Sequence, residues 1–274
     1  MEITVLINNC VHRPDLKAEH GLSLWLDLGS DCILFDTGAS GLIVRNARAL
    51  DIDLKRIKGI ALSHGHYDHT GGLLEVLREI DRPVPIWIHP AAFEKKGAIW
   101  GKGIRDIGIP FSKEELERNG AMFSFSSKPR EIMPRVWLTG EIPRRETFED
   151  VEAILLRKVN NDWEKDQILD DQALIIDSPK GAIIITGCAH AGIINTIKYG
   201  LELIDTKRLY AAIGGFHLWH ASSQRLERTL DALREYDPRL LVIGHCTGME
   251  ASARIKGIFE NRCIFLDVGL KLEI

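Results

Sequence analysis

The chain has 274 residues, and 45% of them are hydrophobic, which is enough for one large core or a core with an insertion. Its formal net charge is −4 and its basic and acidic residues are interspersed, so we expect no nucleic-acid-binding surface. No apolar stretch is long enough to cross a membrane, and the first residues lack the features of a signal peptide, so we expect neither a membrane span nor a signal peptide. Five cysteines without paired spacing indicate a reduced, cytoplasmic setting.

The first 90 residues predict alternating strands and helices. Short apolar runs predict strands over residues 2–8, 22–28, 32–35, 57–62 and 84–88. Helical spacing of apolar residues predicts helices over 40–50 and 71–80, and Asp81-Arg82-Pro83 ends the second of these. The elements around the second helix therefore follow a β-α-β-α-β order.

Residues 91–150 have a less regular pattern, in which glycines, aromatic residues and charged residues are mixed. A short helix over 113–119 and strands near 121–126 and 135–139 are expected there. We interpret the segment as an insertion into a single domain that spans residues 1–274. The insertion either covers the functional site or packs at the periphery, and the sequence favours neither role.

The second half of the chain again alternates strands and helices. Two apolar runs, 173–177 and 182–186, predict a hairpin. The elements expected after it are helix 192–204, strand 209–213, helix 222–236, strand 239–243, helix 250–260 and strand 263–266. A histidine follows each of three predicted strands, at His190, His217 and His245. Sites in α/β folds often form in loops beyond the carboxyl ends of strands, so these histidines are candidate site residues.

Residues 62–73, LSHGHYDHTGGL, concentrate side chains that bind metal ions. His64, His66, Asp68 and His69 fall within six consecutive positions, after an apolar run and before two glycines. Histidines two residues apart in an extended segment point the same way, so His64 and His66 can bind one ion. Asp68 and His69 lie further along the turn and can serve a second ion. Imidazoles and a carboxylate suit zinc, iron or manganese better than calcium or magnesium.

This segment resembles the H-x-H-x-D-H signature of the metallo-β-lactamase superfamily. Phe35-Asp36-Thr37-Gly38 resembles the upstream strand end of that family, whose Asp supports the metal-binding loop. Residues 185–190 (ITGCAH), 213–217 (IGGFH) and 243–248 (IGHCTG) are similar to one branch of the superfamily, which is described as metal-dependent hydrolases. That branch includes a dihydropterin–ribofuranosylaminobenzene-phosphate synthase of methanopterin biosynthesis.

The resemblance implies an α/β (α+β) fold, a four-layer αββα sandwich with a dinuclear metal centre between its two β-sheets. It implies a first ion bound by three histidines and a second bound by two histidines and an aspartate. The first set is His64, His66 and His190, and the second set is Asp68, His69 and His245. Zinc is the expected metal, as one or two ions, and iron or manganese is the alternative.

One position departs from the pattern of the superfamily. Many members have an Asp after a strand and a glycine, where it bridges the two ions, whereas this chain has Cys188 after Gly187. Cys188 is either a thiolate ligand or a small residue near the site. Asp171 is a second carboxylate candidate, with a solvated turn residue as the alternative. The missing Asp leaves open whether one ion or two are bound.

The first functional hypothesis is a hydrolase of a small, phosphorylated or cyclic ester. A metal-activated water attacks, Asp68 orients it, and His217 contacts the substrate or acts as general acid. The first alternative is the pterin-type transferase, in which an electron-rich aryl carbon attacks instead of water and a diphosphate leaves. Trp100, Phe111 and Trp219 are available to stack on a pterin, although aromatic residues more often lie in a core.

Two further alternatives remain. A non-catalytic metal-binding or sensing protein would keep the fold without the chemistry. An iron-based oxidoreductase is disfavoured, because the chain has no flavin-binding domain. The expected partner is a small molecule rather than a nucleic acid or a membrane, and the sequence predicts no oligomeric state.

Overall fold

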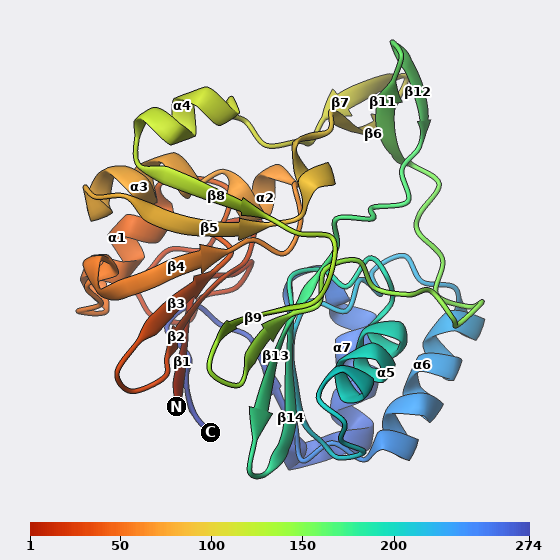
Figure 1. Ribbon diagram of the computed structural model, residues 1–274. Helices are drawn as coiled ribbons and strands as arrows, with labels where there is room; N and C mark the ends of the chain where they lie inside the picture. The colour runs from red at the N-terminus through yellow and green to blue at the C-terminus, as the bar shows by residue number, and fades with distance from the viewer. The chain divides into compact units, whose positions relative to one another are not determined.

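In the computed structural model, which describes all 274 residues, the chain forms two compact units. The first unit comprises Met1–Ser126, Glu152–Asp170 and Asp267–Ile274, and the second comprises Ser127–Val151 and Asp171–Leu266. Each unit contains a seven-stranded β-sheet with helices packed on it (Figure 1). The alternating strands and helices of the sequence are therefore divided between two sheets.

The sheet of the first unit has the strand order β18-β1-β2-β3-β4-β5-β8. Its strands are β1 (Glu2–Ile7), β2 (Ser23–Asp27), β3 (Cys32–Phe35), β4 (Ile57–Ala61), β5 (Val84–Ile88), β8 (Ala121–Phe125) and β18 (Lys271–Glu273). Strands β3, β4, β5 and β8 are parallel, whereas β18, β1 and β2 pair antiparallel. The carboxyl ends of β3 and β4 therefore open at the same edge, where Asp36 and the histidine-rich turn follow them.

Helices pack on this sheet. They are α1 (Leu42–Ala49), α3 (Leu73–Ile80) and α4 (Lys113–Arg118), with the 3-10 helices η1 (Leu54–Arg56) and η2 (Pro90–Phe93). The one-turn helix α2 (Tyr67–Thr70) lies in the loop after β4. Ile43 of α1 and Leu77 of α3 join one apolar core with Ile60 of β4. Burying such a side chain contributes about 1.5–3 kcal/mol. Helix α3 ends at Asp81, which has φ +52°, so the predicted end of this helix is confirmed.

A four-stranded sheet of the first unit was not predicted. Its order is β12-β11-β6-β7, from β6 (Lys96–Trp100), β7 (Gly103–Asp106), β11 (Leu155–Val159) and β12 (Asp162–Lys165). Every residue of β7 is exposed, so its sequence carries no apolar periodicity. The segment 91–150 contributes strands to three sheets, and its role in covering a site stays a prediction.

The sheet of the second unit has the order β17-β16-β15-β14-β13-β10-β9. Its strands are β9 (Arg130–Met133), β10 (Val136–Leu138), β13 (Ala173–Ser178), β14 (Gly181–Thr186), β15 (Leu209–Gly214), β16 (Leu240–Ile243) and β17 (Cys263–Phe265). The predicted hairpin is the β13–β14 pair, and β14 to β17 run parallel. The turns after β14, β15 and β16 consequently lie at one edge of this sheet.

Three helices pack on the second sheet (Figure 1). They are α5 (Ile193–Leu203), α6 (Ser223–Tyr236) and α7 (Met249–Phe259), with the 3-10 helices η3 (His245–Thr247) and η4 (Glu260–Arg262). Helix α6 begins after Ser222, whose hydroxyl accepts the Arg225 N–H at 3.2 Å, and it ends at Asp237 with φ +45°. These caps explain why its bounds agree with the prediction to within a residue.

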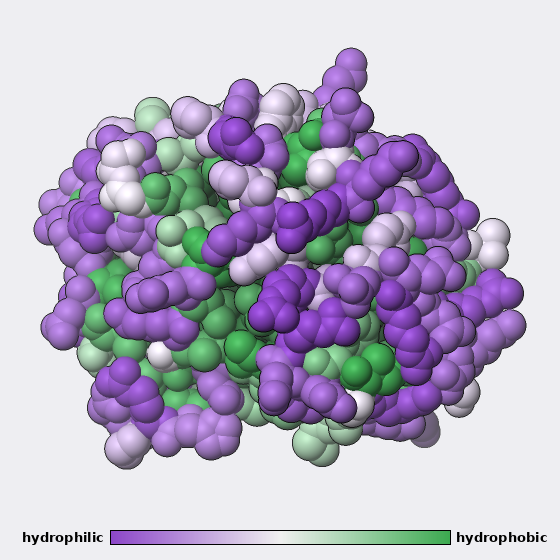
Figure 2. Space-filling model, turned by 90° about the horizontal axis from the view of Figure 1, so that it is seen from below, coloured by the Kyte–Doolittle hydropathy of each residue, from purple (hydrophilic) through white to green (hydrophobic).

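Hydrophilic residues cover much of the face drawn in Figure 2, and hydrophobic residues show between them.

The longest helix, α6, has 14 residues. Crossing a bilayer takes about 20 apolar residues in a helix, and no helix of this structure meets that requirement.

A buried carboxylate joins residues 127–151 to the rest of the second unit. The two side-chain oxygens of Glu149 accept the backbone N–H groups of Ile194 (2.9 Å) and Asn195 (2.7 Å) at the start of α5. Asn195 Oδ1 accepts the N–H groups of Arg145 and Glu146, both at 2.8 Å. Burial raises the pKa of Glu149 to about 7, although the two N–H donors oppose this shift.

We expect this carboxylate to make stability depend on pH. Because the pKa of Glu149 is higher in the fold than in the unfolded chain, its stabilising contribution is complete below about pH 4.5 and is lost as the pH rises through about 7. The loss amounts to about 3 kcal/mol at most. The free energy of unfolding, measured by urea titration across this range, should fall in the wild type and stay flatter in Glu149→Gln. The more exposed Glu146→Gln is the control, and equal slopes for wild type and Glu149→Gln would contradict the assignment.

Candidate functional site

The histidine-rich turn of the first unit follows β4 and gathers three imidazoles. His64 Nε2 and His66 Nδ1 lie 2.9 Å apart, and the ring centroids of His64 and His69 are 4.3 Å apart. All three residues are buried. Asp68 and His69 lie in the one-turn helix α2, after the extended segment that holds His64 and His66. The structure therefore brings together the four ligands that the sequence predicted for this unit.

Asp36 anchors this turn from the end of β3. It is fully buried with φ +58°, and its Oδ1 accepts the Ser63 N–H at 2.7 Å. Its Oδ2 accepts the Ser63 hydroxyl and lies 2.7 Å from His69 Nδ1. This contact favours a proton on Nδ1 of His69 and directs Nε2 toward Asp68 Oδ2, at 3.5 Å. The predicted support of the metal-binding loop by Asp36 is confirmed by these contacts.

The glycines after the motif permit close packing of two turns. A Cβ atom at Gly72 would lie 2.1 Å from the carbonyl oxygen of Thr37. The N–H and hydroxyl of Thr37 both bond to the carbonyl oxygen of His69, at 2.8 and 3.0 Å. The turn after β3 and the turn after β4 are therefore hydrogen-bonded to each other and packed in direct backbone contact.

The surroundings of His66 favour its neutral form, which is the form that can bind a cation. Burial lowers the pKa of His66 to about 3, and the positive charge of Lys96 acts in the same direction, whereas Asp68 and Asp170 oppose the shift. His66 is therefore neutral near pH 7, which is the state in which imidazole binds a metal ion. His20 places Nε2 3.3 Å from Asp68 Oδ2.

In the second unit, the turns after β14, β15 and β16 are strained and tied together. Each turn contains a non-glycine residue with a positive φ: Ala189 (+58°), His217 (+46°) and His245 (+51°). The N–H of Gly215 bonds to the carbonyl oxygen of Gly187 at 3.0 Å and so links two of the turns. Such backbone conformations cost about 1–3 kcal/mol each and concentrate at functional sites.

These turns bring five possible ligands together. The ligand atoms of Cys188, His190 and His217 lie within 4.8 Å of one another, and so do those of Cys188, His245 and Cys246. The ring centroids of His190 and His217 are 4.1 Å apart. Cys188 belongs to both groups. The predicted division of six ligands between two ions stays a prediction.

The sequence analysis missed Cys246, although it directly follows His245 at a strand end. Its Sγ lies 3.5 Å from the Cys188 carbonyl oxygen. Although burial opposes the shift, hydrogen bonding to Cys188 and the nearby His245 and His217 lower the pKa of the Cys246 thiol well below its usual range. A lowered pKa favours the thiolate form of Cys246, and a thiolate is a strong ligand for zinc.

Asp171 supports the His190 turn. Its Oδ2 accepts the N–H of Ala191 at 2.8 Å, one residue after His190. It belongs to none of the groups whose ligand atoms converge. Its role as a metal ligand stays a prediction, and its observed role is to hold backbone.

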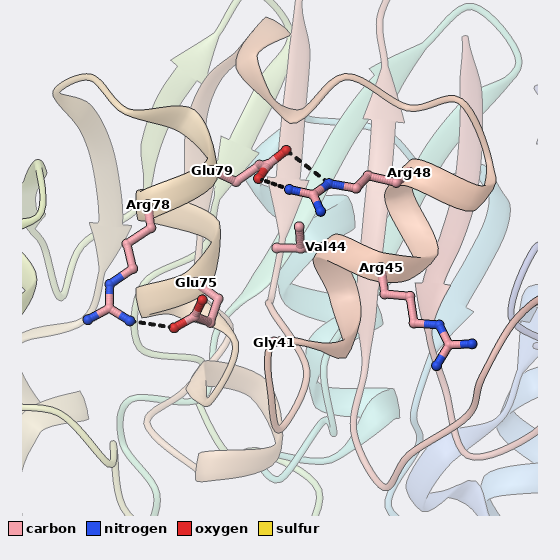
Figure 3. Close-up of a pocket in the computed structure, with 7 residues that line it drawn as sticks. All are labelled: Gly41, Val44, Arg45, Arg48, Glu75, Arg78 and Glu79. Carbon is pink, nitrogen blue, oxygen red and sulfur yellow. Dashed lines mark hydrogen bonds and ion pairs between the residues drawn. The ribbon is translucent and has the colours of Figure 1, made fainter.

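A hollow of about 420 Å³ lies between α1 and α3, and its lining lacks the histidines and cysteines that could bind a metal ion (Figure 3). Its charged residues are mostly paired, Arg48 with Glu79 and Arg78 with Glu75, both at 2.6 Å. Arg45 points away from these pairs. No histidine, cysteine or aspartate lines the hollow, so the histidine-rich turns are the better candidate.

The donor atoms of the turns fit a transition-metal ion. Buried imidazoles, one aspartate and two thiols are borderline to soft ligands, which favour zinc or iron over calcium or magnesium. Asp36 adds the carboxylate–histidine contact that commonly orients a metal-binding imidazole.

We expect Asp36→Asn to weaken metal binding about 10–100-fold, because the amide loses the charged acceptor for His69 Nδ1–H. Asparagine tolerates a positive φ, so the backbone turn should survive the change. Zinc affinity would be measured by competition with a chromophoric chelator. Asp31→Asn, at a partly exposed position of the same unit, is the control. An unchanged zinc affinity in Asp36→Asn would show that the carboxylate does not act on the metal site.

Comparisons with known proteins identify relatives of this chain. The model of the metallo-beta-lactamase superfamily matches residues 17–245. The chain is 35% identical over 243 residues to the 7,8-dihydropterin-6-methyl-4-(beta-D-ribofuranosyl)-aminobenzene-5'-phosphate synthase of Methanocaldococcus jannaschii, covering 85% of this chain and 83% of the synthase. It is 32% identical over 267 residues to an uncharacterized protein of the same organism, covering 97% and 98% of the two chains.

Solved structures show the same fold. Tm1679, described as a metal-dependent hydrolase of the beta-lactamase superfamily, is 31% identical with a TM-score of 0.86, covering 100% of this chain and 99% of its own. Zinc-bound PqqB from Methylobacterium extorquens is 12% identical with a TM-score of 0.60 and full coverage of both chains, a likeness of fold alone. With the family model matching most of its length, this chain belongs to the metallo-beta-lactamase superfamily, as its histidine motif implied.

Proposed function

We propose that this protein is a metal-dependent transferase that joins a dihydropterin diphosphate to ribofuranosylaminobenzene phosphate. The observation that carries the proposal is the 35% identity, over 85% of this chain, to the Methanocaldococcus jannaschii synthase. The proposed metal ligands are His64, His66, Asp68 and His69 of the first unit and His190 and His245 of the second, with Cys188 as a further donor. Zinc is the proposed metal, and iron or manganese would suit the same donors.

In the proposed reaction, the amine nitrogen of the aminobenzene attacks the methylene carbon attached to the pterin. A C–N bond forms, the C–O bond to diphosphate breaks, and the nitrogen gives up one proton. We assign the attack to nitrogen, rather than to the aryl carbon considered from the sequence. The amine lone pair is the more available electron pair, and its reaction leaves the ring aromatic.

The side chains of the turns have distinct roles in this scheme. When bound, the metal ion supplies a Lewis acid that offsets the negative charge of the leaving diphosphate. Asp68 Oδ2, between His20 and His69, accepts the proton of the attacking amine. His217, at a turn with positive φ beside His190, holds a proton for the leaving group.

Trp219 is the proposed stacking surface for the pterin. Its backbone N–H bonds to the carbonyl oxygen of Cys246 at 3.2 Å, so it is fixed to the ligand-bearing turns of the second unit. Its side chain is 62% exposed, which leaves a ring face available to an aromatic substrate.

Trp219→Ala should raise the KM for dihydropterin diphosphate about 10-fold, because the lost stacking is worth about 1–1.5 kcal/mol. Steady-state kinetics of both substrates would measure the effect. Trp100→Ala removes another exposed tryptophan, from the first unit, and should leave KM unchanged. Equal effects of the two substitutions would argue against a stacking role for Trp219.

The second candidate function is hydrolysis of a small, phosphorylated or cyclic ester. The 31% identity to Tm1679, described as a metal-dependent hydrolase, favours it. The same donors would serve, with water as the nucleophile in place of the amine. The two functions differ in whether the cleaved bond is replaced by a bond to nitrogen or to oxygen.

The deciding experiment combines metal analysis with two assays. Protein purified without added metal should contain zinc, iron or manganese and should form the coupled product and diphosphate, detected by mass spectrometry, from the two substrates. A chelator should abolish the product, and Cys188→Ser should lose metal, whereas Cys263→Ser, a buried cysteine of β17, should keep it. Ester hydrolysis without coupled product would establish the second candidate. Failure to bind metal after reconstitution would leave a non-catalytic protein.

A further inference from the structure

A buried ion cluster of the first unit touches the histidine-rich turn. Lys96, the first residue of β6, places Nζ 2.7 Å from Asp170 Oδ1 and 3.1 Å from Asp166 Oδ2. The side chains are 1%, 0% and 4% exposed, in the order Lys96, Asp170 and Asp166. Removing such charges from water is costly, and apolar residues in their place are often as stable or more so. A contribution to stability therefore does not by itself explain why these three charged side chains are buried together.

The cluster reaches the turn through Asp170. The second oxygen of this carboxylate, Oδ2, accepts the backbone N–H of Gly65 at 2.7 Å. Gly65 is the residue between His64 and His66, so the bond acts on the peptide that joins the two imidazole-bearing residues. A Cβ at Gly65 would lie 2.0 Å from the Ala92 carbonyl oxygen, which shows how closely η2 packs there. The turn therefore contacts both η2 and the Asp170 carboxylate.

Asp166 lacks this contact with the turn. Its Oδ1 accepts the N–H of Ile168 at 2.7 Å, within its own loop, and its Oδ2 pairs with Lys96. The two aspartates therefore share a lysine and a buried environment, and they differ in what their remaining oxygen holds. Asp171, the next residue after Asp170, holds the turn of the second unit by the same kind of bond, to the N–H of Ala191.

We propose that Asp170 is a positioning residue for the His64–His66 turn and that Lys96 is the buried counter-charge that holds its carboxylate in place. This proposal rests on the proposed function, because the turn it positions is the one assigned to the metal. Neither residue touches a substrate, and the link to the chemistry runs through the Gly65 peptide. A charged acceptor makes a shorter and stronger bond to this N–H than a neutral one would.

The test compares Asp170→Asn with the matched variant Asp166→Asn. Each removes one charge from the cluster, and only Asp170→Asn weakens the acceptor of the Gly65 N–H. We expect Asp170→Asn to lower cobalt(II) affinity about 10–100-fold and to shift the visible absorption of the cobalt-loaded protein. Asp166→Asn should leave the spectrum unchanged and the affinity within about twofold, even if both variants unfold at lower urea concentrations.

Amide hydrogen exchange supplies a second measurement that needs no metal. In the metal-free protein, the Gly65 amide should exchange faster in Asp170→Asn than in Asp166→Asn or the wild type. Equal effects of the two substitutions on cobalt affinity, spectrum and Gly65 exchange would overturn the positioning role alone. A wild-type protein that binds no cobalt would overturn the proposed function and this role with it, even if Gly65 exchange responded as expected.

Discussion

The structure of the first unit depends on one buried carboxylate at the end of a parallel strand. Asp36 has no solvent to stabilise its charge, so its oxygens must be satisfied by the turn beside it, and they are satisfied by Ser63 and His69. Because β3 and β4 are parallel neighbours, the residues that follow them meet at the same edge. The hydrogen bonds that the buried Asp36 carboxylate requires therefore also orient His69, a proposed metal ligand.

In the second unit, the candidate metal ligands also lie in turns at one edge of a sheet, and these turns have strained backbone conformations. Three parallel strands end in turns that each contain a residue with positive φ, and backbone bonds between the turns hold these conformations. Cys188, His190, His217, His245 and Cys246 are concentrated there as a consequence. Soft sulfur donors at this edge distinguish the chain from superfamily members that carry a bridging aspartate, and they favour zinc or iron over harder cations.

Backbone support recurs around these turns. Asp36, Asp170 and Asp171 each accept an N–H from a residue next to a proposed ligand, at 2.7, 2.7 and 2.8 Å. Charged acceptors make stronger bonds to backbone donors than neutral ones, so the ligands sit on turns of defined geometry. Ligands held in this way lose less freedom when an ion binds, which is the physical advantage of preorganisation.

The sequence by itself determined the order of strands and helices, the histidine motif and the family, because periodicity, capping residues and close ligand spacing are local properties. It also indicated Asp36, through its place at a strand end. It did not predict the sheet of β6, β7, β11 and β12, in which β7 is exposed throughout and lacks apolar periodicity. Only the tertiary structure showed that Lys96 and Asp170, 74 positions apart, pair beneath Gly65, and that Cys246 joins Cys188. Such contacts depend on which strands become neighbours, and that is decided by packing of the whole unit rather than by any short stretch of chain.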